Sequence, residues 1–444
     1  MLVTRSLARL SAALSFAYVL RATVLGVPTT ALEICLVATL IAYVVEKRRA
    51  GEPFPDPRRL PYCWPVALLL VAATISVLVA PDRRAAAGIW KAYFVEPALI
   101  AYVLADALRA RRDLEKLVAA FFFGAIAVAV LNILTFLFVL GTNPTGIVEH
   151  PPVMIYFTPN ATGLFLGPLL AIAAALLFFG RGQERGRSAV FIAVALPAFV
   201  LSFSRGAWLG LLVALVFLAL QTRRRWLAAG IVVAGGAASL LVPAVRRRVA
   251  HELSTNDPNN SVNSRVTLWK ATFRMMAHGL HPVLGTGLSG FKAAMAAVKE
   301  STPYREDLIY PHNLYLDFWT ETGLLGLAAF VWLSVEWVRR TVATVRAATD
   351  LRPYYLGLAA ASVTILVHGL LDVPFFKNDL AFLTFALVGM QVAAMRRDGL
   401  AGPPPTGRSG AGVPATPPAP APLAAAAAAA SPAVAAAADP DSGA

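Results

Sequence analysis

The chain has 444 residues, of which 58% are hydrophobic and 14% are charged. Soluble globular proteins have about 45–50% apolar and roughly 25% charged residues. This excess of apolar residues excludes a water-soluble globular domain, a disordered chain and a disulfide-linked scaffold. The composition instead predicts an all-α polytopic membrane protein.

The formal net charge is +14, from 39 basic and 25 acidic residues. A charge of this sign can indicate nucleic-acid binding, but here the basic residues lie in short clusters between apolar segments. That placement is typical of the positive-inside pattern of membrane proteins. We therefore expect membrane lipid around the chain and no nucleic-acid partner.

A membrane span needs about 20 mostly apolar residues, and about twelve segments approach this length. The first is weak because it contains Arg9 and Arg21, and we expect it to be retained rather than cleaved. The predicted spans are 6–25, 28–46, 62–80, 85–105, 114–140, 159–179, 188–203, 206–221, 226–245, 312–338, 354–372 and 378–395.

Basic residues are concentrated in every second loop, which places these loops and both termini in the cytoplasm. The long loop at 246–311 is the exception, since it begins with three arginines, but long loops translocate largely regardless of charge. The basic loops carry Lys47, Arg48 and Arg49; Arg109, Arg111 and Arg112; Arg181, Arg185 and Arg187; Arg223, Arg224 and Arg225; and Arg339, Arg340 and Arg346.

Four parts follow from this layout. Residues 1–245 form an N-terminal bundle of about nine helices, and 312–396 form the C-terminal transmembrane helices. The extracytoplasmic loop 246–311 contains two expected helices, at 262–278 and 289–299. The Pro/Ala-rich tail at 397–444 is predicted to be disordered and cytoplasmic.

Two arginines on the extracytoplasmic side are candidate anion ligands. Arg205 lies in the short connection SFSRGAWLG, and Arg265 follows Asn263 and Ser264, either of which can cap the first loop helix. A planar guanidinium suits bidentate phosphate binding. The structural alternatives are an interfacial anchor for Arg205 and a solvated loop residue for Arg265.

His312 lies where the long loop re-enters the membrane, and histidine suits general-base chemistry near neutral pH. Asn313, Asp317 and Glu321 recur at a spacing of four residues and share one helix stripe. Glu321 would lie about 13 Å along this helix from His312. Lys91 is its candidate partner, and the alternative is that these residues form packing ion pairs.

A further group lies at the end of the predicted span 354–372. His368 and Asp372 are four residues apart on one face, and Lys377 and Asp379 follow. The pair could form a hydrogen-bonded cap or could line the same cavity as His312, and the sequence leaves both open.

Other motifs are absent or misleading. The stretch GTGLSG at 285–290 matches a dinucleotide-binding pattern, but no strand precedes it, so we expect it to form the turn between the two loop helices. No spacing of histidines, cysteines or carboxylates indicates a metal site. We therefore expect no cofactor and no metal.

Four stretches resemble the O-antigen ligase and O-antigen polymerase superfamily. They are SFSRGAWLG, NSRVTLWKATFRMMAHGLHPVLGTGLSGF, YPHNLYLDFWTETGLLGLAAF and the closing VHGLLDVPFFKNDLAF. The resemblance covers roughly 200–330 well. The motifs are fairly specific as a set, and the twelve-span layout with one large outer loop agrees with the family.

The resemblance implies metal-independent, inverting glycan transfer outside the cytoplasmic membrane of a bacterium. The donor is then a glycan on undecaprenyl diphosphate, and the acceptor is a hydroxyl of a glycolipid, a glycan or a protein. By resemblance, Arg205 and Arg265 hold the donor diphosphate, and His312 is the base or the group that orients the acceptor.

Three alternatives stay open. A polysaccharide repeat-unit polymerase of the same superfamily would share these motifs. A secondary transporter would use Lys91, Glu96, Asp317 and Glu321 as an ionisable pathway, although no internal repeat supports it. A structural assembly factor for envelope polysaccharide, without catalysis, is the third.

Overall fold

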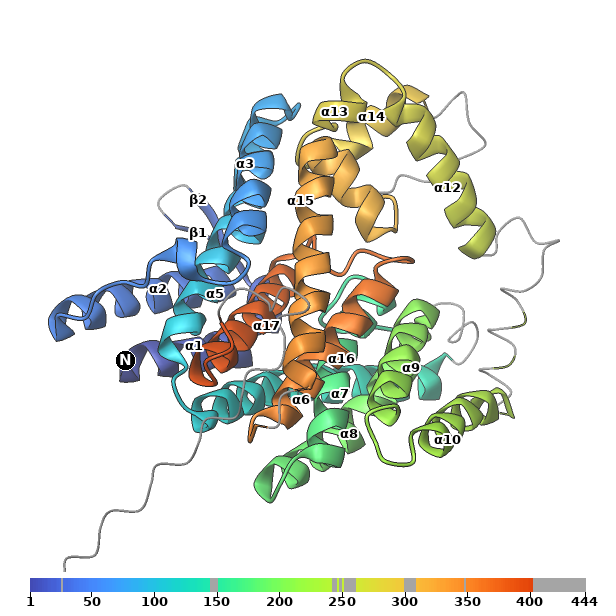
Figure 1. Cartoon of the computed structure of the whole chain (residues 1–444). Coiled ribbons are helices and arrows are strands. Elements are labelled where there is room, and N and C mark those ends of the chain that lie inside the picture. Colours follow the sequence, from blue (N-terminus) through green and yellow to red (C-terminus); the bar gives the residue numbers. More distant parts are fainter. Residues whose placement is uncertain are drawn as a thin grey trace, which may run out of the picture. The chain divides into compact units, whose positions relative to one another are not determined.

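The computed structural model describes residues 1–24, 27–143, 151–241, 246, 250, 261–298, 309–346 and 349–401. The chain divides into a unit of Met1–Pro404 and a unit of Pro405–Ala444, and the second unit lies outside the described residues, as does nearly all of the predicted tail. The described secondary structure is almost entirely helical, as expected from the composition (Figure 1).

The N-terminal segment departs from the prediction of a span at 6–25. It forms a short helix α1 (Leu2–Ala13), a 3-10 turn η1 (Ser15–Val19) and a strand β1 (Arg21–Val24), which pairs antiparallel with β2 (Val27–Thr30). The apolar run is interrupted by Arg21, and the β-branched residues after it favour a strand. The prediction of a first transmembrane helix is therefore wrong.

The arginines of α1 have a structural role instead. Arg5 and Arg9 both bind the carboxylate of Asp113, at 2.9 and 3.4 Å. Asp113 also caps the start of α6 through the backbone N–H of Ala110. These contacts attach α1 to α6.

The remaining helices follow in chain order. They are α2 (Ala31–Ala50), η2 (Pro57–Arg59), α3 (Cys63–Val79), α4 (Arg83–Ile89), the π-helical turn η3 (Trp90–Val95), α5 (Glu96–Ala107), α6 (Arg111–Thr142), α7 (Pro159–Phe179), α8 (Gln183–Leu201), α9 (Arg205–Ala219), α10 (Arg225–Ala238), η4 (Ser239–Leu241), α12 (Ser261–Met276), α13 (His281–Leu284), α14 (Phe291–Val298), α15 (Leu314–Val345), α16 (Arg352–His368) and α17 (Asn378–Arg397).

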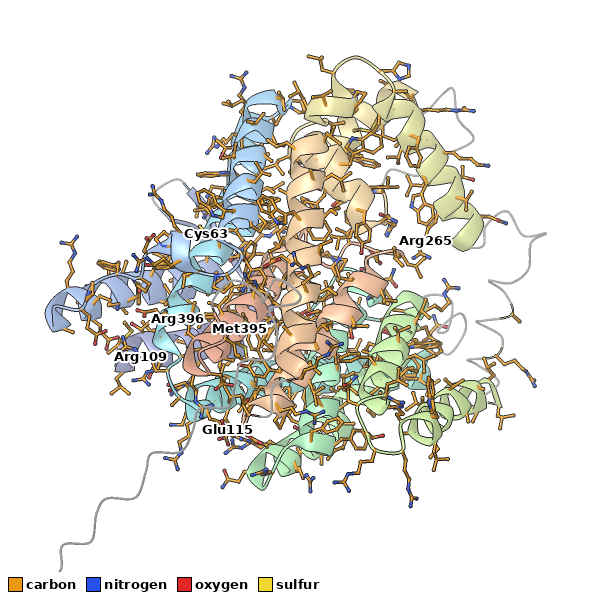
Figure 2. All side chains as sticks on the ribbon, viewed as in Figure 1. Cys63, Arg109, Glu115, Arg265, Met395 and Arg396 are labelled. Atoms are coloured by element: carbon orange, nitrogen blue, oxygen red, sulfur yellow. The ribbon has the colours of Figure 1, made fainter. Side chains whose placement is uncertain are left out.

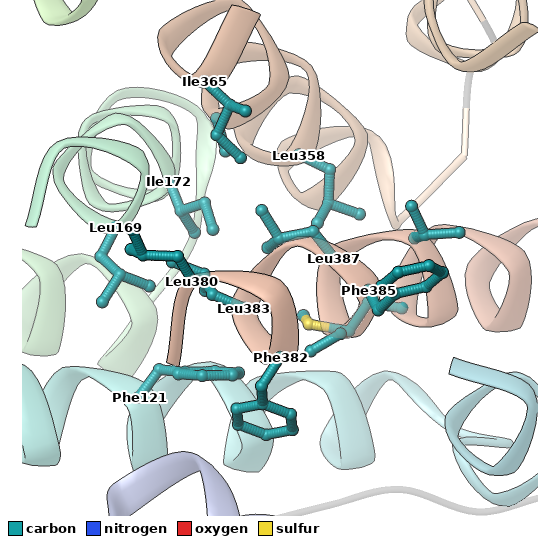
Figure 3. Packing of buried hydrophobic residues seen from close by; sticks show 14 of the residues in the cluster. Phe121, Leu169, Ile172, Leu358, Ile365, Leu380, Phe382, Leu383, Phe385 and Leu387 are labelled. Carbon is teal, nitrogen blue, oxygen red and sulfur yellow. The ribbon is translucent and has the colours of Figure 1, made fainter. Parts of the chain in front are cut away.

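The core is built around α7, α16 and α17, whose residues are buried on nearly every face. An apolar helix buried all round is expected at the centre of a membrane bundle. Phe121 of α6 packs on Phe382 of α17, with ring centroids 5.6 Å apart. Figure 3 shows the leucines of α17 packed against α7 and α16, with Leu169, Ile172, Leu358, Ile365, Leu380, Leu383 and Leu387 labelled.

Five helices among the described residues are long and apolar enough to cross a membrane. They are the continuous segment Arg83–Ala107 and the helices α6, α7, α15 and α17. Three apolar helices, α3, α9 and α10, are shorter. The protein is thus a helical membrane protein, and the number of about twelve spans stays a prediction.

The predicted span 312–338 is two helices, not one. Gly323 has φ +69° and ψ −171°, which breaks α15 into a short first segment and a long second segment. The ring of Phe318 stacks on Phe330 at 4.0 Å, whereas a straight helix would separate these residues by about 18 Å. The two segments therefore fold back on each other.

Glycine is required at this bend. A Cβ on Gly323 would collide with the backbone of Val283 and Leu284 in α13, and the positive φ disfavours any other residue. The predicted stripe of Asn313, Asp317 and Glu321 therefore lies on the short segment, and Glu321 lies near the bend against the loop helices rather than deeper along a span.

Both predicted loop helices are confirmed. They correspond to α12 and α14, and the GTGLSG stretch forms the turn before α14, with positive φ at Gly285 and Gly287. Figure 1 shows α12, α13 and α14 grouped beside the bend of α15. This group covers the junction at which His312 lies.

Candidate functional site

The start of α15 is attached to the end of α16 by a set of capping bonds. Asn313 accepts from the N–H groups of Tyr315 and Leu316, both at 3.0 Å, and its Nδ2 donates to Leu370 O at 2.9 Å. The N–H of Leu314 donates to Gly369 O at 2.7 Å. Asn313 is thus an N-cap that also fixes two helix ends together.

This junction brings His312 to Asp372. His312 Nδ1 lies 3.2 Å from Asp372 Oδ1, and the histidine is half-buried while the aspartate is buried. His312 also has φ +50°, a left-handed conformation that costs roughly 1–2 kcal/mol in a non-glycine residue. Such strain persists only where the surrounding structure fixes the backbone. Here Pro311 precedes His312, and the N-cap residue Asn313 follows it.

Arg265 and His368 complete a cluster around Asp372. Burial alone would raise the pKa of Asp372, but the hydrogen bond from His312 and electrostatic interactions with His312, His368 and Arg265 outweigh it, so the pKa lies well below its usual value. Burial lowers the pKa of Arg265, and the charge of Asp372 opposes that effect. Figure 2 shows Arg265 at the end of α12 that is nearer to α9 and α16.

The prediction that Asn263 or Ser264 caps the helix of Arg265 is wrong. Because α12 begins at Ser261, Asn263 and Ser264 lie inside the helix rather than before it. Arg265 therefore extends from the second turn of α12. Its position beside Asp372 depends on how α12 packs over the junction and not on a helix N-terminus.

Arg205 is the first residue of α9 and lies beside the same cluster. Its neighbour Gly206 packs so closely on His368 that a Cβ there would lie 2.8 Å from His368 Cδ2. Gly210 lies one turn later, and a Cβ on it would lie 3.0 Å from Thr364 O. Small residues at this spacing let two helices approach closely, and this approach sets the distance between Arg205 and His368.

Sequence reasoning missed two aromatic residues of the site. The ring of Tyr310 lies edge-on to His312, with centroids 4.8 Å apart, and Trp269 Nε1 donates to Pro311 O at 2.9 Å. Burial and the carboxylates of Asp372 and Asp317 raise the pKa of Tyr310. Both residues stand in the motifs that contain Arg265 and His312, but helix periodicity alone does not single them out.

The expected pairing of Lys91 with Glu321 is wrong. Lys91 Nζ lies 3.3 Å from Glu33 and 3.6 Å from Glu96. Glu321 instead accepts from the backbone N–H groups of Ser289 and Phe291 at the start of α14. A carboxylate at a helix N-terminus is a stabilising cap, so Glu321 anchors the loop helices to the short segment of α15.

Lys377 and Asp379 begin α17, away from the direct contacts of His312. Asp379 is fully buried and lies next to the hydroxyl of Tyr156. Asp317 is also buried, and neither of its oxygens has a hydrogen-bond partner within the described ranges. The structure therefore gathers Arg265, His312, His368 and Asp372, places Arg205 next to them, and leaves Lys91 and Glu321 in other contacts.

No group of three or more His, Cys, Asp or Glu side chains with metal-binding geometry occurs in the part of the chain that the structure describes. The cluster offers a hydrogen-bonded imidazole and two guanidinium groups. Chemically, it can accept a proton and can hold an anion.

Fold and site together define a helical membrane protein whose candidate site residues lie around the start of α15 and the end of α16. Residues 189–331 match the family model described as O-antigen ligase, so this segment is similar to the O-antigen ligase and polymerase superfamily, as the sequence motifs suggested. No curated protein matches the chain. The matched segment contains Arg205, Arg265 and His312, whereas His368 and Asp372 come from outside it.

Proposed function

We propose that this protein transfers a glycan from an undecaprenyl-diphosphate-linked donor to an acceptor hydroxyl, on the outer side of the cytoplasmic membrane of a bacterium. The family match supports O-antigen ligase-like glycan transfer in general. The observation that carries the specific proposal is the His312–Asp372 pair at 3.2 Å, with Arg265 beside it.

In the proposed reaction, His312 is the general base. When Nδ1–H donates to Asp372, the lone pair of Nε2 is free to take the proton of the acceptor hydroxyl. The acceptor oxygen then forms the new bond to C1 of the donor sugar as the C1–O bond to the diphosphate breaks, which inverts the anomeric configuration. Such a base is worth typically 10²–10⁴-fold in rate.

The arginines act on the leaving group. As the C1–O bond breaks, negative charge increases on the diphosphate, and Arg205 and Arg265 stabilise that charge more in the transition state than in the ground state. The fixed fork of each guanidinium can bind two phosphate oxygens. No metal or nucleotide enters this proposal, because the diphosphate is already a good leaving group.

The proposed location rests on the loop charges. The basic loops, such as the one with Arg339 and Arg340 that follows α15, favour the cytoplasmic side, which puts the His312 junction on the opposite side. The undecaprenyl chain would lie in lipid beside the apolar helices, so that the diphosphate reaches the junction from the membrane.

The test is reconstitution of the purified protein with a lipid-diphosphate glycan, candidate acceptors and a chelator. A product joined to a glycolipid or protein supports a ligase, and extension of the glycan itself supports the polymerase alternative. A secondary transporter is a second candidate function, because Asp317 is buried without a hydrogen-bond partner among the described residues. Solute flux without glycan transfer would overturn the proposed glycan transfer and support a transporter.

A further inference from the structure

An open pocket lies away from the direct contacts of His312. It has a volume of about 820 Å³ and is lined by the β1–β2 hairpin, α4 and η3. Aromatic side chains line it together with charged ones, namely Tyr18, Trp90, Tyr93, Arg21, Arg84 and Lys91. This volume is in the range of small-ligand sites, which are apolar and aromatic with a few placed polar groups.

We propose that this cavity is the acceptor site, and that Arg21 and Arg84 bind an anionic group, a phosphate or a carboxylate, on the acceptor glycan. The assignment as acceptor site rests on the proposed function. The binding of an anionic sugar in this pocket does not depend on the proposed function and can be tested separately.

The charges in the cavity favour an anion. Both acidic groups that line it are already engaged: Asp82 caps α4 through the N–H groups of Arg84 and Ala85, both at 3.0 Å, and Glu33 binds Lys91. Arg21 and Arg84 are exposed, and within the described ranges neither guanidinium forms an ion pair or a hydrogen bond. Two cations are therefore available to a ligand.

The wall of the cavity is held in place by a buried network. Glu33 completes a capping box with Thr30 at the start of α2 and accepts from Asn378 Nδ2 at 3.1 Å. Lys91 binds Glu33 from the π-helical turn η3. A π-turn inside a helix is often found at a functional site, and this one sets Trp90 and Tyr93 against the cavity.

Tyr18 lines the pocket, and both Arg21 and Tyr310 interact with it electrostatically. The ring of Tyr310 contacts His312, with centroids 4.8 Å apart. An acceptor whose anionic group is bound by Arg21 and Arg84 could therefore extend past Tyr18 toward His312.

The probe for this site is N-acetylglucosamine 1-phosphate, with N-acetylglucosamine as its neutral counterpart. Binding is measured by calorimetry on the full chain in phosphatidylcholine nanodiscs. We expect the phosphorylated sugar to bind the wild type and the neutral sugar to bind at least tenfold more weakly. Each substitution, Arg21→Ala and Arg84→Ala, should weaken binding on the order of tenfold, as for the loss of one charge-assisted hydrogen bond.

Two controls locate the binding. Arg83→Ala removes an exposed arginine next to Arg84 that does not line the cavity, and it should leave binding unchanged. Arg265→Ala removes a proposed donor ligand and should also leave it unchanged. Loss of binding in Arg265→Ala with retention in the Arg21→Ala, Arg84→Ala double variant would overturn the proposal, because the probe would then occupy the donor site.

A last arm separates an acceptor from a membrane lipid, whose headgroup carries the same phosphate chemistry. The measurement is repeated in nanodiscs that contain phosphatidylglycerol, and we expect the same affinity. Displacement of the probe by this lipid would show a headgroup site and overturn the assignment. In the transfer assay the probe should compete with the acceptor and not with the donor. His312→Ala should bind the probe normally, so failure of the catalytic proposal would remain distinguishable.

Discussion

Two sets of buried ionisable residues in this protein are organised differently. In the first, Asp106 is bound by Lys47 at 2.8 Å, by the hydroxyl of Tyr43 at 3.0 Å and by Arg396 at 3.3 Å. In the second, Asp372 is bound by His312 through one oxygen, and its other oxygen has no hydrogen-bond partner within the described residues. Figure 2 shows Arg396 well away from Arg265.

This difference separates structure from function. A buried carboxylate whose oxygens are all bound is stable as it stands, and removal of a partner leaves an uncompensated charge. A buried carboxylate with an unused oxygen, next to a strained histidine and an arginine, is a site at which a substrate can complete the interactions. The comparison predicts that substitutions in the second set change rate, and that substitutions in the first set change stability.

The largest effect is expected for His312→Ala. Loss of the base should lower glycan transfer by at least about 100-fold while donor binding is retained. The measurement is initial rate in the reconstituted assay beside binding of the lipid-diphosphate donor. His278→Ala, an exposed histidine after α12, is the matched control and should behave as the wild type. Normal transfer by His312→Ala would exclude its assigned role.

Asp372→Asn should have the next largest effect. The amide keeps the shape of the side chain but no longer stabilises the protonated imidazole, so we expect kcat to fall by about 10²-fold with little change in the donor KM. Asp56→Asn, at an exposed aspartate, should leave both values unchanged. An increase in KM alone would show that Asp372 only supports substrate binding.

Lysine at the arginine positions should produce a smaller loss. Arg205→Lys and Arg265→Lys keep the charge but lose the bidentate fork, and we expect donor engagement to weaken by about tenfold. The measurement is KM for the lipid-diphosphate donor, with Lys270→Ala on the exposed side of α12 as the control. Full activity of both lysine variants would argue against direct diphosphate binding.

The smallest effect on rate is expected in the fully paired set. Lys47→Met leaves Asp106 with one charged partner fewer in a buried setting, which costs on the order of 3–5 kcal/mol of stability. The melting temperature should fall while kcat and KM of the folded fraction stay unchanged. A selective loss of kcat with an unchanged melting temperature would place this set in the mechanism and remove the distinction drawn above.

Much of the bundle could be predicted from apolar length. Most predicted spans from 28–46 onward fall on helical segments, although 85–105 covers α4, η3 and α5, and the two expected loop helices correspond to α12 and α14. The exceptions follow from local chemistry. The segment at 6–25 turns into a hairpin after a helix that ends at Ala13, and the span at 312–338 bends at Gly323. A hydropathy average over about 20 residues does not detect such positions, because one glycine can bend the chain without changing the apolar composition of the segment.

Site residues could be predicted where they lie in one short motif. Contacts between residues far apart in the sequence could not. Spacing placed His368 and Asp372 on one face, but it did not predict the hydrogen bond that His312 donates to Asp372, which joins residues 60 positions apart. Charge alone suggested the pairing of Lys91 with Glu321, whereas Glu33 is its partner. The pattern of Thr30 and Glu33 three residues apart is a readable capping box and could have identified Glu33 as an ordered residue.

The most direct test of the account is the anomeric configuration of the transferred sugar. A donor of known configuration is converted by the reconstituted wild-type protein, and the new linkage is assigned by nuclear magnetic resonance. Direct attack by an acceptor that is deprotonated at His312 predicts an inverted linkage and release of the polyprenyl diphosphate. A retained configuration would require a covalent glycosyl intermediate and would contradict the single displacement on which the roles of His312 and Asp372 depend.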